Sequence, residues 1–472
     1  MLFNLHKPNL QAITVLLEAF LEQEYQSRGM AGLSIALVSG RECIWSRGFG
    51  FADVEQEIKA SPETVYRIAS LTKPFTVTML MQLRDAGKLH LDEPVERFIP
   101  ELKTLKSSLN AHVPITFRHL ASHYAGLPRE LPEAFTYQEE QQAVRFSSVD
   151  EMLVSLKQVE LLAPPMAQQH YSNLGFALLG LALERIADEP YTQYIVRNIL
   201  QPLGMQSSGF EPVECLEKQI QERIARPYAA GLRPTTPTLV NALHPASGLF
   251  STVEDMVRFM AFLFHDGQQA ENQILQESSI REMCSPLFID PTWQNATGMS
   301  WEFSHVQNET ILGHSGRLFG YSADMRFIPS LQLGLVALTN TYEQDIKNLA
   351  YTLLEMILPV FKYLFRGRDP VEVEAQEPET PSPMLQAWRC YEGHYQCEVL
   401  AQSADVLVKE NRLISRLVDI ESELVPTTEE HVFRVEGGPV DDLFAQFELD
   451  EKGKAHTVKA LGFTFVRTEV MS

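Results

Sequence analysis

The sequence predicts an α+β protein: an antiparallel sheet flanked by helices, an inserted all-helical part, and a small C-terminal all-β barrel. Strand-like runs stand at both ends of the first ~360 residues, and helical runs lie between them. Beyond a break rich in Pro and Glu, apolar and polar residues alternate in short runs separated by turn signals. That second pattern is typical of a small β-barrel or sandwich.

The N-terminal part predicts a helix followed by a hairpin. Residues 10–26 place their apolar side chains on one face, which indicates an amphipathic helix. Residues 33–39 and 43–50 read as two strands, and the Ser-Gly-Arg-Glu turn between them predicts that they pair antiparallel.

The middle of the chain predicts the helical part and the return of the sheet. Helical periodicity covers 75–86, 149–156 and 174–186. Strands are expected at 325–328 and 333–338, with a helix at 253–264 before them and a closing helix at 342–360. We therefore predict one two-part unit over residues 1–365, a linker over 366–384 and a β-barrel domain over 385–472.

Composition excludes several functional classes. The 472 residues carry 39 Lys+Arg against 61 Asp+Glu, a net charge of −22, which argues against nucleic acid or an anionic membrane surface as the main partner. No apolar run reaches the ~18 residues that a membrane span needs. Five cysteines without a C-x-x-C pair and no visible signal peptide predict reduced thiols and a cytoplasmic location, or a periplasmic one if the start is truncated.

No metal or cofactor is predicted. His119, His123 and His170 are interpreted as structural, because no Glu completes an H-E-x-x-H zinc motif with them. The G-x-S-x-G elbow of α/β-hydrolases and the G-x-x-x-x-G-K phosphate loop are both missing from the sequence.

Ser70 and Lys73 form the first candidate pair for chemistry. If a helix begins at Ser70, the three-residue spacing puts the hydroxyl and the amine on one face, and Pro74 suits the first turn. A serine at a helix start lies beside free backbone donors that can hold an oxyanion, and a lysine can act as base if burial lowers its pKa. The alternative is an N-capping serine followed by a surface lysine.

Two more segments accompany this pair. Tyr171-Ser-Asn173 opens an apolar helical run, so the phenol could move a proton if a nearby ammonium lowers its pKa, and Asn173 could hold a substrate amide. Gly313-His-Ser-Gly316 precedes a strand-like run, and its small residues would let a substrate backbone approach closely. Taken singly, the tyrosine could be a packed aromatic and the glycine-rich segment an ordinary turn.

In this order the three segments resemble the serine β-lactamase and penicillin-binding protein superfamily. The branch they resemble has a Tyr-x-Asn motif: class C β-lactamases, D-Ala-D-Ala carboxypeptidases, D-aminopeptidases and esterases. The resemblance extends over about residues 10–360 and includes four longer segments: Tyr66-Arg-Ile-Ala-Ser-Leu-Thr-Lys-Pro-Phe-Thr, Ile115-Thr-Phe-Arg-His-Leu-Ala-Ser-His-Tyr-Ala-Gly-Leu-Pro, Pro245-Ala-Ser-Gly-Leu-Phe-Ser-Thr-Val-Glu-Asp-Met and Gly313-His-Ser-Gly-Arg-Leu-Phe-Gly-Tyr. It implies a β-lactamase/transpeptidase-like fold and acyl transfer through an ester intermediate, without metal or cofactor.

The resemblance also implies roles. Ser70 would be the acylated nucleophile, and Lys73 and Tyr171 would share general base and acid work. Asn173 would orient the acyl side chain. The strand edge would be lined by His314, Ser315 and Gly316. The oxyanion hole would be formed by the backbone N–H groups of Ser70 and Arg317.

Two departures narrow the expected substrate. His314 stands where β-lactamases and carboxypeptidases carry Lys, and a neutral imidazole would hold a substrate carboxylate less well. Arg317 or Arg326 could restore the charge, although a surface or packing role was the main expectation for both. Tyr124-Ala replaces the usual Thr-Ser.

The resulting prediction is a serine hydrolase for small-molecule or short peptide substrates, an amidase, peptidase or esterase of D-aminopeptidase type. The alternatives are a β-lactamase or D-Ala-D-Ala carboxypeptidase, and a non-catalytic binding or scaffold protein with the same fold. Tyr391-Glu-Gly-His-Tyr and Gly462-Phe-Thr-Phe-Val-Arg resemble lipocalin-like domains appended to some family members, which cover the active-site mouth or build oligomers. Homo-oligomerisation therefore stays open.

Overall fold

The computed structural model describes most of the chain and divides it into two compact units. One is formed by residues 25–351, and the other by the residues before and after that range. The described residues are 11–106, 113–138, 143–211, 217–236, 238–264, 273–292, 295–342, 345–365, 388–397, 402–409, 412–417, 420–436, 443–460 and 463–468. The predicted linker at 366–384 lies outside them, so it and the predicted domain boundaries stay predictions.

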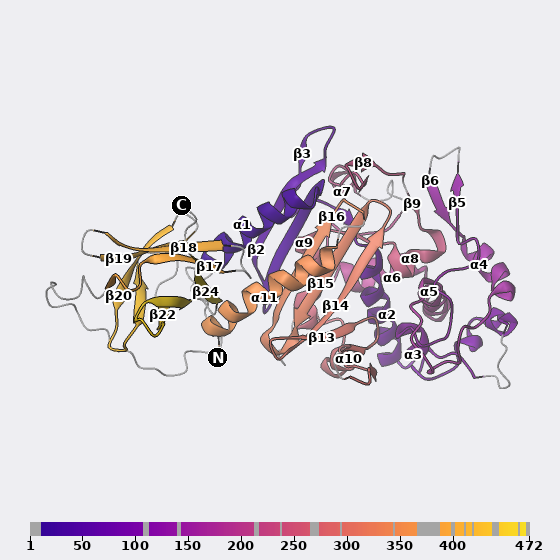
Figure 1. Ribbon diagram of the computed structural model, residues 1–472. Helices are drawn as coiled ribbons and strands as arrows, with labels where there is room; N and C mark the ends of the chain where they lie inside the picture. The colour runs from indigo at the N-terminus through magenta and orange to yellow at the C-terminus, as the bar shows by residue number, and fades with distance from the viewer. Residues whose placement is uncertain are drawn as a thin grey trace. The chain divides into compact units, whose positions relative to one another are not determined.

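A nine-stranded antiparallel sheet forms the centre of the larger unit (Figure 1). The predicted hairpin is confirmed as two of its strands, and the predicted late strands lie beside it. In sheet order the strands are β11 (Phe288–Ile289), β12 (Ala296–Thr297), β13 (Glu302–Val306), β14 (Glu309–Leu318), β15 (Tyr321–Ile328), β16 (Leu333–Thr339), β1 (Gly32–Ser39), β2 (Glu42–Asp53) and β3 (Ile58–Lys59).

The middle of the sheet is covered on both faces. Every residue of β1, β15 and β16 is buried. This explains why β1 and β16 read as almost continuous apolar runs, whereas β15 alternates and buries its polar residues Ser322, Asp324 and Arg326 as well. Helix α9 (Val253–Leu263) contacts β1, β2 and β16, and Met260 reaches Gly334 of the sheet. The core therefore runs continuously from the sheet into the helices.

The helices between β4 (Tyr66–Arg67) and β13 in sequence, apart from α9, make up the inserted part, and Figure 1 shows α2, α3, α5, α6 and α8 gathered together beside the sheet. The three predicted helical runs are confirmed as α2, α4 and α5. The helices of this part are α2 (Lys73–Asp85), α3 (Phe117–Ala121), α4 (Val149–Ser155), α5 (Asn173–Ala187), α6 (Tyr191–Ile195), α7 (Lys218–Gln221), α8 (His244–Ser247) and α10 (Glu277–Met283).

Several short strands and two further helices make up the rest of the fold before the C-terminal barrel. The N-terminal and closing helices are confirmed as α1 (Gln11–Ser27) and α11 (Ile346–Phe365). None of the helices within the described residues combines the length and apolar character that crossing a membrane requires. The small sheets are made of β4 (Tyr66–Arg67), β5 (Phe135–Gln138), β6 (Ala143–Phe146), β7 (Tyr228–Ala229), β8 (Arg233–Pro234), β9 (Thr238–Leu239) and β10 (Phe250–Ser251).

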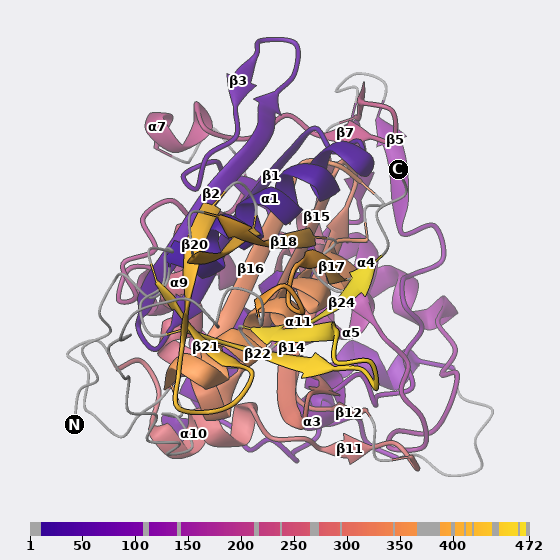
Figure 2. The same cartoon turned by 60° about the vertical axis from the view of Figure 1, so that its left-hand side comes forward.

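The predicted C-terminal barrel is confirmed as a closed eight-stranded barrel, seen in orange to yellow in Figure 2. It closes because its last strand pairs with its first. Buried aromatic rings fill the interior, with Phe447 in contact with Tyr391, Tyr395 and Phe433. The strands are β17 (Gly393–Cys397), β18 (Gln402–Lys409), β19 (Arg412–Leu417), β20 (Ile420–Pro426), β21 (Val432–Glu436), β22 (Leu443–Leu449), β23 (Ala455–Ala460) and β24 (Phe463–Thr468). Its likeness to lipocalins stays a prediction.

Candidate active site

Ser70 lies in a tight turn immediately before α2. The sequence predicted that an α-helix begins at Ser70; instead, residues Ala69–Thr72 form a 3₁₀ turn and α2 begins at Lys73. Pro74 occupies the first turn of α2, as expected. Ala69 has a φ of 48°, in the left-handed region that side chains with a Cβ rarely adopt. The structure thus places a strained residue next to the candidate nucleophile, and such strain is concentrated at functional sites.

Lys73 is fully buried and its amine contacts three oxygen atoms. Its Nζ lies 2.9 Å from Oγ of Ser70, 2.7 Å from Oδ1 of Asn173 and 2.9 Å from the carbonyl oxygen of Ala246 in α8. Burial lowers the pKa of Lys73 well below its usual value, against the opposing charge of Glu130. The burial that a lysine base needs to lower its pKa is therefore present at Lys73.

Asn173 links Lys73 to a carboxylate that the sequence did not reveal. While its Oδ1 accepts from Lys73, its Nδ2 donates to Oε1 of Glu130 at 2.5 Å. Both polar ends of the side chain are therefore occupied, and its contacts position the base; the predicted contact with the acyl side chain stays a prediction. Helix α5 holds Asn173 at its first residue because the hydroxyl of Ser172 caps the helix by accepting from N–H of Gly175 at 2.8 Å.

Tyr171 packs among the amine of Lys73, the guanidinium of Arg129 and the ring of His123. Lys73 Nζ and Arg129 Cζ lie 4.9 and 5.0 Å from the centre of its ring, and the ring of His123 lies 4.2 Å away. Burial raises the pKa of the Tyr171 phenol above its usual value, although a hydrogen bond with Ser70 acts in the opposite direction. The lowered pKa under which this phenol was expected to move a proton is not found, because desolvation of the phenol outweighs its favourable contacts.

Strand β14 brings Gly316 against the nucleophile turn. A Cβ on this glycine would lie 2.2 Å from the carbonyl oxygen of Ile68 and 3.1 Å from the backbone nitrogen of Ser70. Only glycine fits here, because the strand itself packs against the nucleophile turn; the expected close approach of a substrate backbone stays a prediction. His314 shares this face, and its ring centre lies 6.0 Å from that of Tyr171.

Ser315 points away from the nucleophile. Its hydroxyl donates to Oδ2 of Asp324 at 2.5 Å and accepts from Nη2 of Arg326 at 2.8 Å. Arg326 is fully buried and its Nε also donates to Asp324 at 2.8 Å. Because side chains alternate along a strand, Arg317 belongs to the same face as Ser315, and it is exposed. The predicted side-chain role of Ser315 at the substrate edge is not supported by these contacts; the N–H of Arg317 as an oxyanion donor stays a prediction.

His314 provides no ammonium where the resemblance would place a lysine. Burial lowers its pKa to about 4, although the neighbouring carboxylate of Glu302 favours the charged form. Its Nδ1 lies 2.7 Å from the carbonyl oxygen of Ser315. At neutral pH this side chain is therefore an uncharged imidazole. Arg326 does not restore the charge either, since Asp324 and Glu302 are its partners.

The three histidines interpreted as structural have structural contacts. Nδ1 of His119 accepts from N–H of Thr116 at the start of α3, and Nδ1 of His123 accepts from N–H of Ser172 at 3.1 Å. N–H of His170 donates to the carbonyl of His123. Across the described ranges, no group of three or more His, Cys, Asp or Glu side chains is arranged to hold a metal ion.

Three groups at this site escaped the sequence analysis: the guanidinium of Arg129, the carboxylate of Glu130 and the carbonyl of Ala246. Arg129 and Glu130 follow directly after the segment 115–128 that carries the resemblance, and that adjacency was the available signal. Tyr124, the second departure from the expected pattern, stacks on Phe288 of β11, with ring centres 3.4 Å apart.

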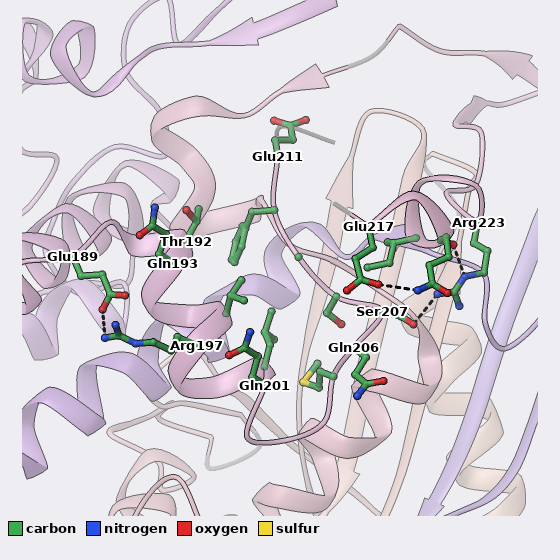
Figure 3. Close-up of a pocket in the computed structure, with 18 residues that line it drawn as sticks. Glu189, Thr192, Gln193, Arg197, Gln201, Gln206, Ser207, Glu211, Glu217 and Arg223 are labelled. Atoms are coloured by element: carbon green, nitrogen blue, oxygen red, sulfur yellow. Dashed lines mark hydrogen bonds and ion pairs between the residues drawn. The ribbon is translucent and has the colours of Figure 1, made fainter. Parts of the chain in front are cut away.

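A cavity of about 970 Å³ lies elsewhere in the larger unit, and none of the predicted site residues lines it (Figure 3). Figure 3 shows Arg197 paired with Glu189 on one side, at 2.6 Å, and Arg223 on the other side. Nη2 of Arg223 donates to Ser207 Oγ at 2.9 Å. Some of the polar groups drawn in Figure 3 pair with one another, whereas Thr192, Gln193 and Gln206 are drawn without such a contact.

Comparison with known proteins agrees with this geometry. A sequence model of the family described as Beta-lactamase matches residues 17–355. The chain is 30% identical over 370 residues to Beta-lactamase-like protein 2 of Dictyostelium discoideum, covering 76% of this chain and 65% of that protein, or less than two thirds of its length. It is 27% identical to Putative beta-lactamase-like 1 of Homo sapiens, over 77% of this chain and 72% of that protein.

Solved structures show the same fold. The octameric penicillin-binding protein homologue from Pyrococcus abyssi has a TM-score of 0.64 at 23% identity, covering 96% of this chain and all (100%) of that one. The β-lactamase/D-alanine carboxypeptidase from Yersinia pestis has a TM-score of 0.60 at 24% identity, covering 73% of this chain and 98% of that one.

Proposed function

The chain belongs to the beta-lactamase family, and from its site geometry we propose that it is a serine hydrolase that acts through an acyl-enzyme. Ser70 would be the nucleophile, Lys73 the general base and Tyr171 the general acid. The substrates proposed are amides, short peptides or esters, as in D-aminopeptidases and esterases of this family.

The contacts of the Lys73 amine carry the proposal. A neutral amine has two hydrogens and one lone pair. Asn173 Oδ1 and the Ala246 carbonyl can only accept, so they take both hydrogens. The amide of Asn173 cannot be flipped, because its other end donates to Glu130. The lone pair is left for the remaining neighbour, the hydroxyl of Ser70 at 2.9 Å, which is the arrangement of a general base and its nucleophile.

The reaction then follows in two halves. Ser70 Oγ attacks the substrate carbonyl carbon as its proton moves to Lys73 Nζ, and a C–O bond forms. The leaving group departs with a proton from the Tyr171 phenol, whose raised pKa keeps it protonated and able to donate. The phenol regains its proton from the Lys73 ammonium, which restores the neutral amine. Water then attacks the ester and gives a proton to Lys73. That proton passes to Ser70 Oγ as its bond to the acyl carbon breaks, which releases the acid and restores the neutral amine and the serine hydroxyl. Backbone N–H groups of Ser70 and Arg317 are the proposed oxyanion donors.

β-Lactamases and D-Ala-D-Ala carboxypeptidases carry a lysine at the position of His314, and its ammonium helps to hold the substrate carboxylate. The neutral His314 of this chain therefore favours esters, amides and peptides over β-lactams and D-Ala-D-Ala termini. The alternative activity, β-lactamase or D-Ala-D-Ala carboxypeptidase, is supported by the description of the Yersinia pestis neighbour. A non-catalytic binding protein is the alternative of another class. The strained Ala69 and the buried Lys73 argue against it, since a scaffold has no need of either.

Intact mass spectrometry tests the proposal. The chain is exposed separately to a fluorophosphonate and to penicillin. We expect a fluorophosphonate adduct that is lost in Ser70→Ala and kept in the control Ser148→Ala, which removes the exposed N-cap of α4. No adduct with either reagent would favour the non-catalytic alternative, and a penicillin adduct that turns over rapidly would favour the β-lactamase.

We also propose homo-oligomerisation, supported by the octameric state that describes the Pyrococcus abyssi homologue. Light scattering of the full chain measures it, and a single species with the monomer mass of 53.4 kDa would contradict it. The cytoplasmic location stays a proposal that rests on the sequence alone.

A further inference from the structure

The guanidinium of Arg129 is an exposed cation at the candidate active site. It lies over the ring of Tyr171, with Cζ 5.0 Å from the ring centre. Within the part of the chain that the structure describes, it forms no ion pair. Its charge acts on Lys73, His123 and Tyr171, shifting the pKa of each in the direction expected of a nearby cation.

Other cations near the site are not available to a substrate. Burial disfavours the charged forms of the Lys73 amine and the His314 imidazole, lowering the pKa of Lys73 well below its usual value and that of His314 to about 4. Arg326 is buried and held by Asp324, and Arg317 lies on the opposite face of β14. Arg129 alone among these five residues combines permanent charge, exposure and contact with a catalytic candidate.

Glu130 is the carboxylate nearest in sequence, but its contacts are elsewhere. Its Oε1 accepts from Nδ2 of Asn173 at 2.5 Å, and its charge acts on Lys73. The cation of Arg129 favours the charged form of Glu130, but among the described residues the two side chains form no ion pair. The guanidinium of Arg129 therefore keeps its donor groups free for another anion.

Arg129 is also within reach of a substrate bound at Ser70. Because Lys73 Nζ and Arg129 Cζ flank the same ring, at 4.9 and 5.0 Å from its centre, they are no more than about 10 Å apart. Lys73 Nζ in turn lies 2.9 Å from Ser70 Oγ. A short carbon chain spans such a separation, and the long arginine side chain can turn toward its end.

We propose that Arg129 binds a carboxylate of the substrate, so that the preferred esters, amides or peptides of this chain are anionic. The inference rests on the hydrolase function proposed above and names the substrate class. In this account the positive charge that binds the substrate carboxylate is provided by Arg129, in the segment before α5, instead of by a residue at the position of His314 on β14. Arg129 contacts substrate in this account and sets specificity, while proton transfer stays with Lys73 and Tyr171.

Matched ester pairs test the inference by kcat/KM. For the acyl side, 4-nitrophenyl hydrogen glutarate is compared with 4-nitrophenyl pentanoate, which lacks the carboxylate. For the leaving-group side, 4-carboxyphenyl pentanoate is compared with phenyl pentanoate. In at least one pair we expect Arg129→Ala to lower kcat/KM for the anionic ester about tenfold and for the neutral ester less than about twofold. Arg129→Lys should keep part of the preference, since it keeps the charge and loses the fork.

The control is Arg281→Ala, another exposed arginine, on helix α10. Equal losses on both members of each pair, or no loss in either pair, would overturn the inference. Loss in one pair shows on which side of the scissile bond the carboxylate binds.

A binding measurement separates this inference from the hydrolase proposal. Calorimetric titration of Ser70→Ala with 4-nitrophenyl hydrogen glutarate reads the carboxylate contact without turnover. Affinity that falls about tenfold when Arg129→Ala is added supports the contact even if the wild-type chain hydrolyses nothing. Hydrolysis of the neutral esters with no dependence of this affinity on Arg129 overturns the inference and leaves the hydrolase proposal standing.

Discussion

At the scale of single residues, the buried amine of Lys73 couples the proposed chemistry to the stability of the fold. The folded chain holds it neutral, while the unfolded chain would protonate it below the usual pKa of 10.5. Between the two pKa values the unfolded state binds one more proton, so the free energy of unfolding rises as pH rises through this window. Stability is given up here for a base that can work near neutral pH.

Comparison of the wild type with Lys73→Met isolates this effect. The variant leaves two carbonyl acceptors without a donor, which shifts its stability by an amount that does not depend on pH. The wild-type advantage should therefore grow by about 1.4 kcal/mol per pH unit between the folded and unfolded pKa values. Urea denaturation at pH 8, 9 and 10 measures the difference. A difference that stays constant across this range would show that the pKa of Lys73 is not lowered.

At the scale of elements, the site depends on how closely α5 and α8 approach. A Cβ on Gly180 of α5 would lie 2.0 Å from Cγ of Pro245, and the next residue of α8, Ala246, provides the carbonyl that accepts from Lys73. Close packing of the two helices thus requires a glycine at position 180, two turns along α5 from Asn173. By allowing α8 to approach, this glycine helps to position the Ala246 carbonyl that accepts from Lys73.

We expect Gly180→Ala to push α8 away and to disturb that acceptor. Overpacking should cost about 1–3 kcal/mol of unfolding free energy and slow fluorophosphonate labelling of Ser70. Intact mass spectrometry at a series of reaction times measures the rate of labelling, and urea denaturation measures the free energy of unfolding. Labelling at the wild-type rate in a destabilised variant would refute the link between the α5–α8 contact and the base.

Strand β15 carries a buried ion pair behind the site, between Asp324 and Arg326. Both side chains are fully buried, whereas the second carboxylate on Arg326, that of Glu302, is 45% exposed. Removing one member of a buried pair leaves a charge without compensation, but an exposed partner is replaced by water.

Asp324→Asn should therefore lower the free energy of unfolding by about 3 kcal/mol, and the matched variant Glu302→Gln by less than about 1 kcal/mol. Chemical denaturation at pH 7 compares the two. Equal costs would mean that burial does not set the strength of this pair.

Sequence periodicity predicted the elements because their residues repeat with the spacing of the structure they form. The hairpin of β1 and β2, the helices α2 and α5 and the barrel strands all have such local signals. The sequence also contains the information on side-chain direction in β14. Consecutive residues of a strand face opposite sides, so the side chains of His314 and Ser315 could not both line the substrate edge. The positions of Glu130 and Ala246 depend on tertiary packing of short segments, for which the sequence has no local signal.

At the scale of the whole molecule, the C-terminal barrel and the nine-stranded sheet are separate hydrogen-bonded sheets. Every barrel strand pairs only with other barrel strands, and the ladder closes on itself. The rings around Phe447 belong to the barrel alone. A structural change in the barrel interior therefore cannot be transmitted to Ser70 through a shared β-sheet.

Phe447→Ala tests this independence in the full chain. Truncating a ring that is 2% exposed should destabilise the barrel by about 3–5 kcal/mol. Calorimetry should show a transition that moves to lower temperature in the variant, while the rate of fluorophosphonate labelling at 25 °C stays at the wild-type value. Labelling that slows in proportion to the loss of barrel stability would instead make the barrel part of the working site. In that case the expectation that such domains cover the active-site mouth would gain its first support from this chain.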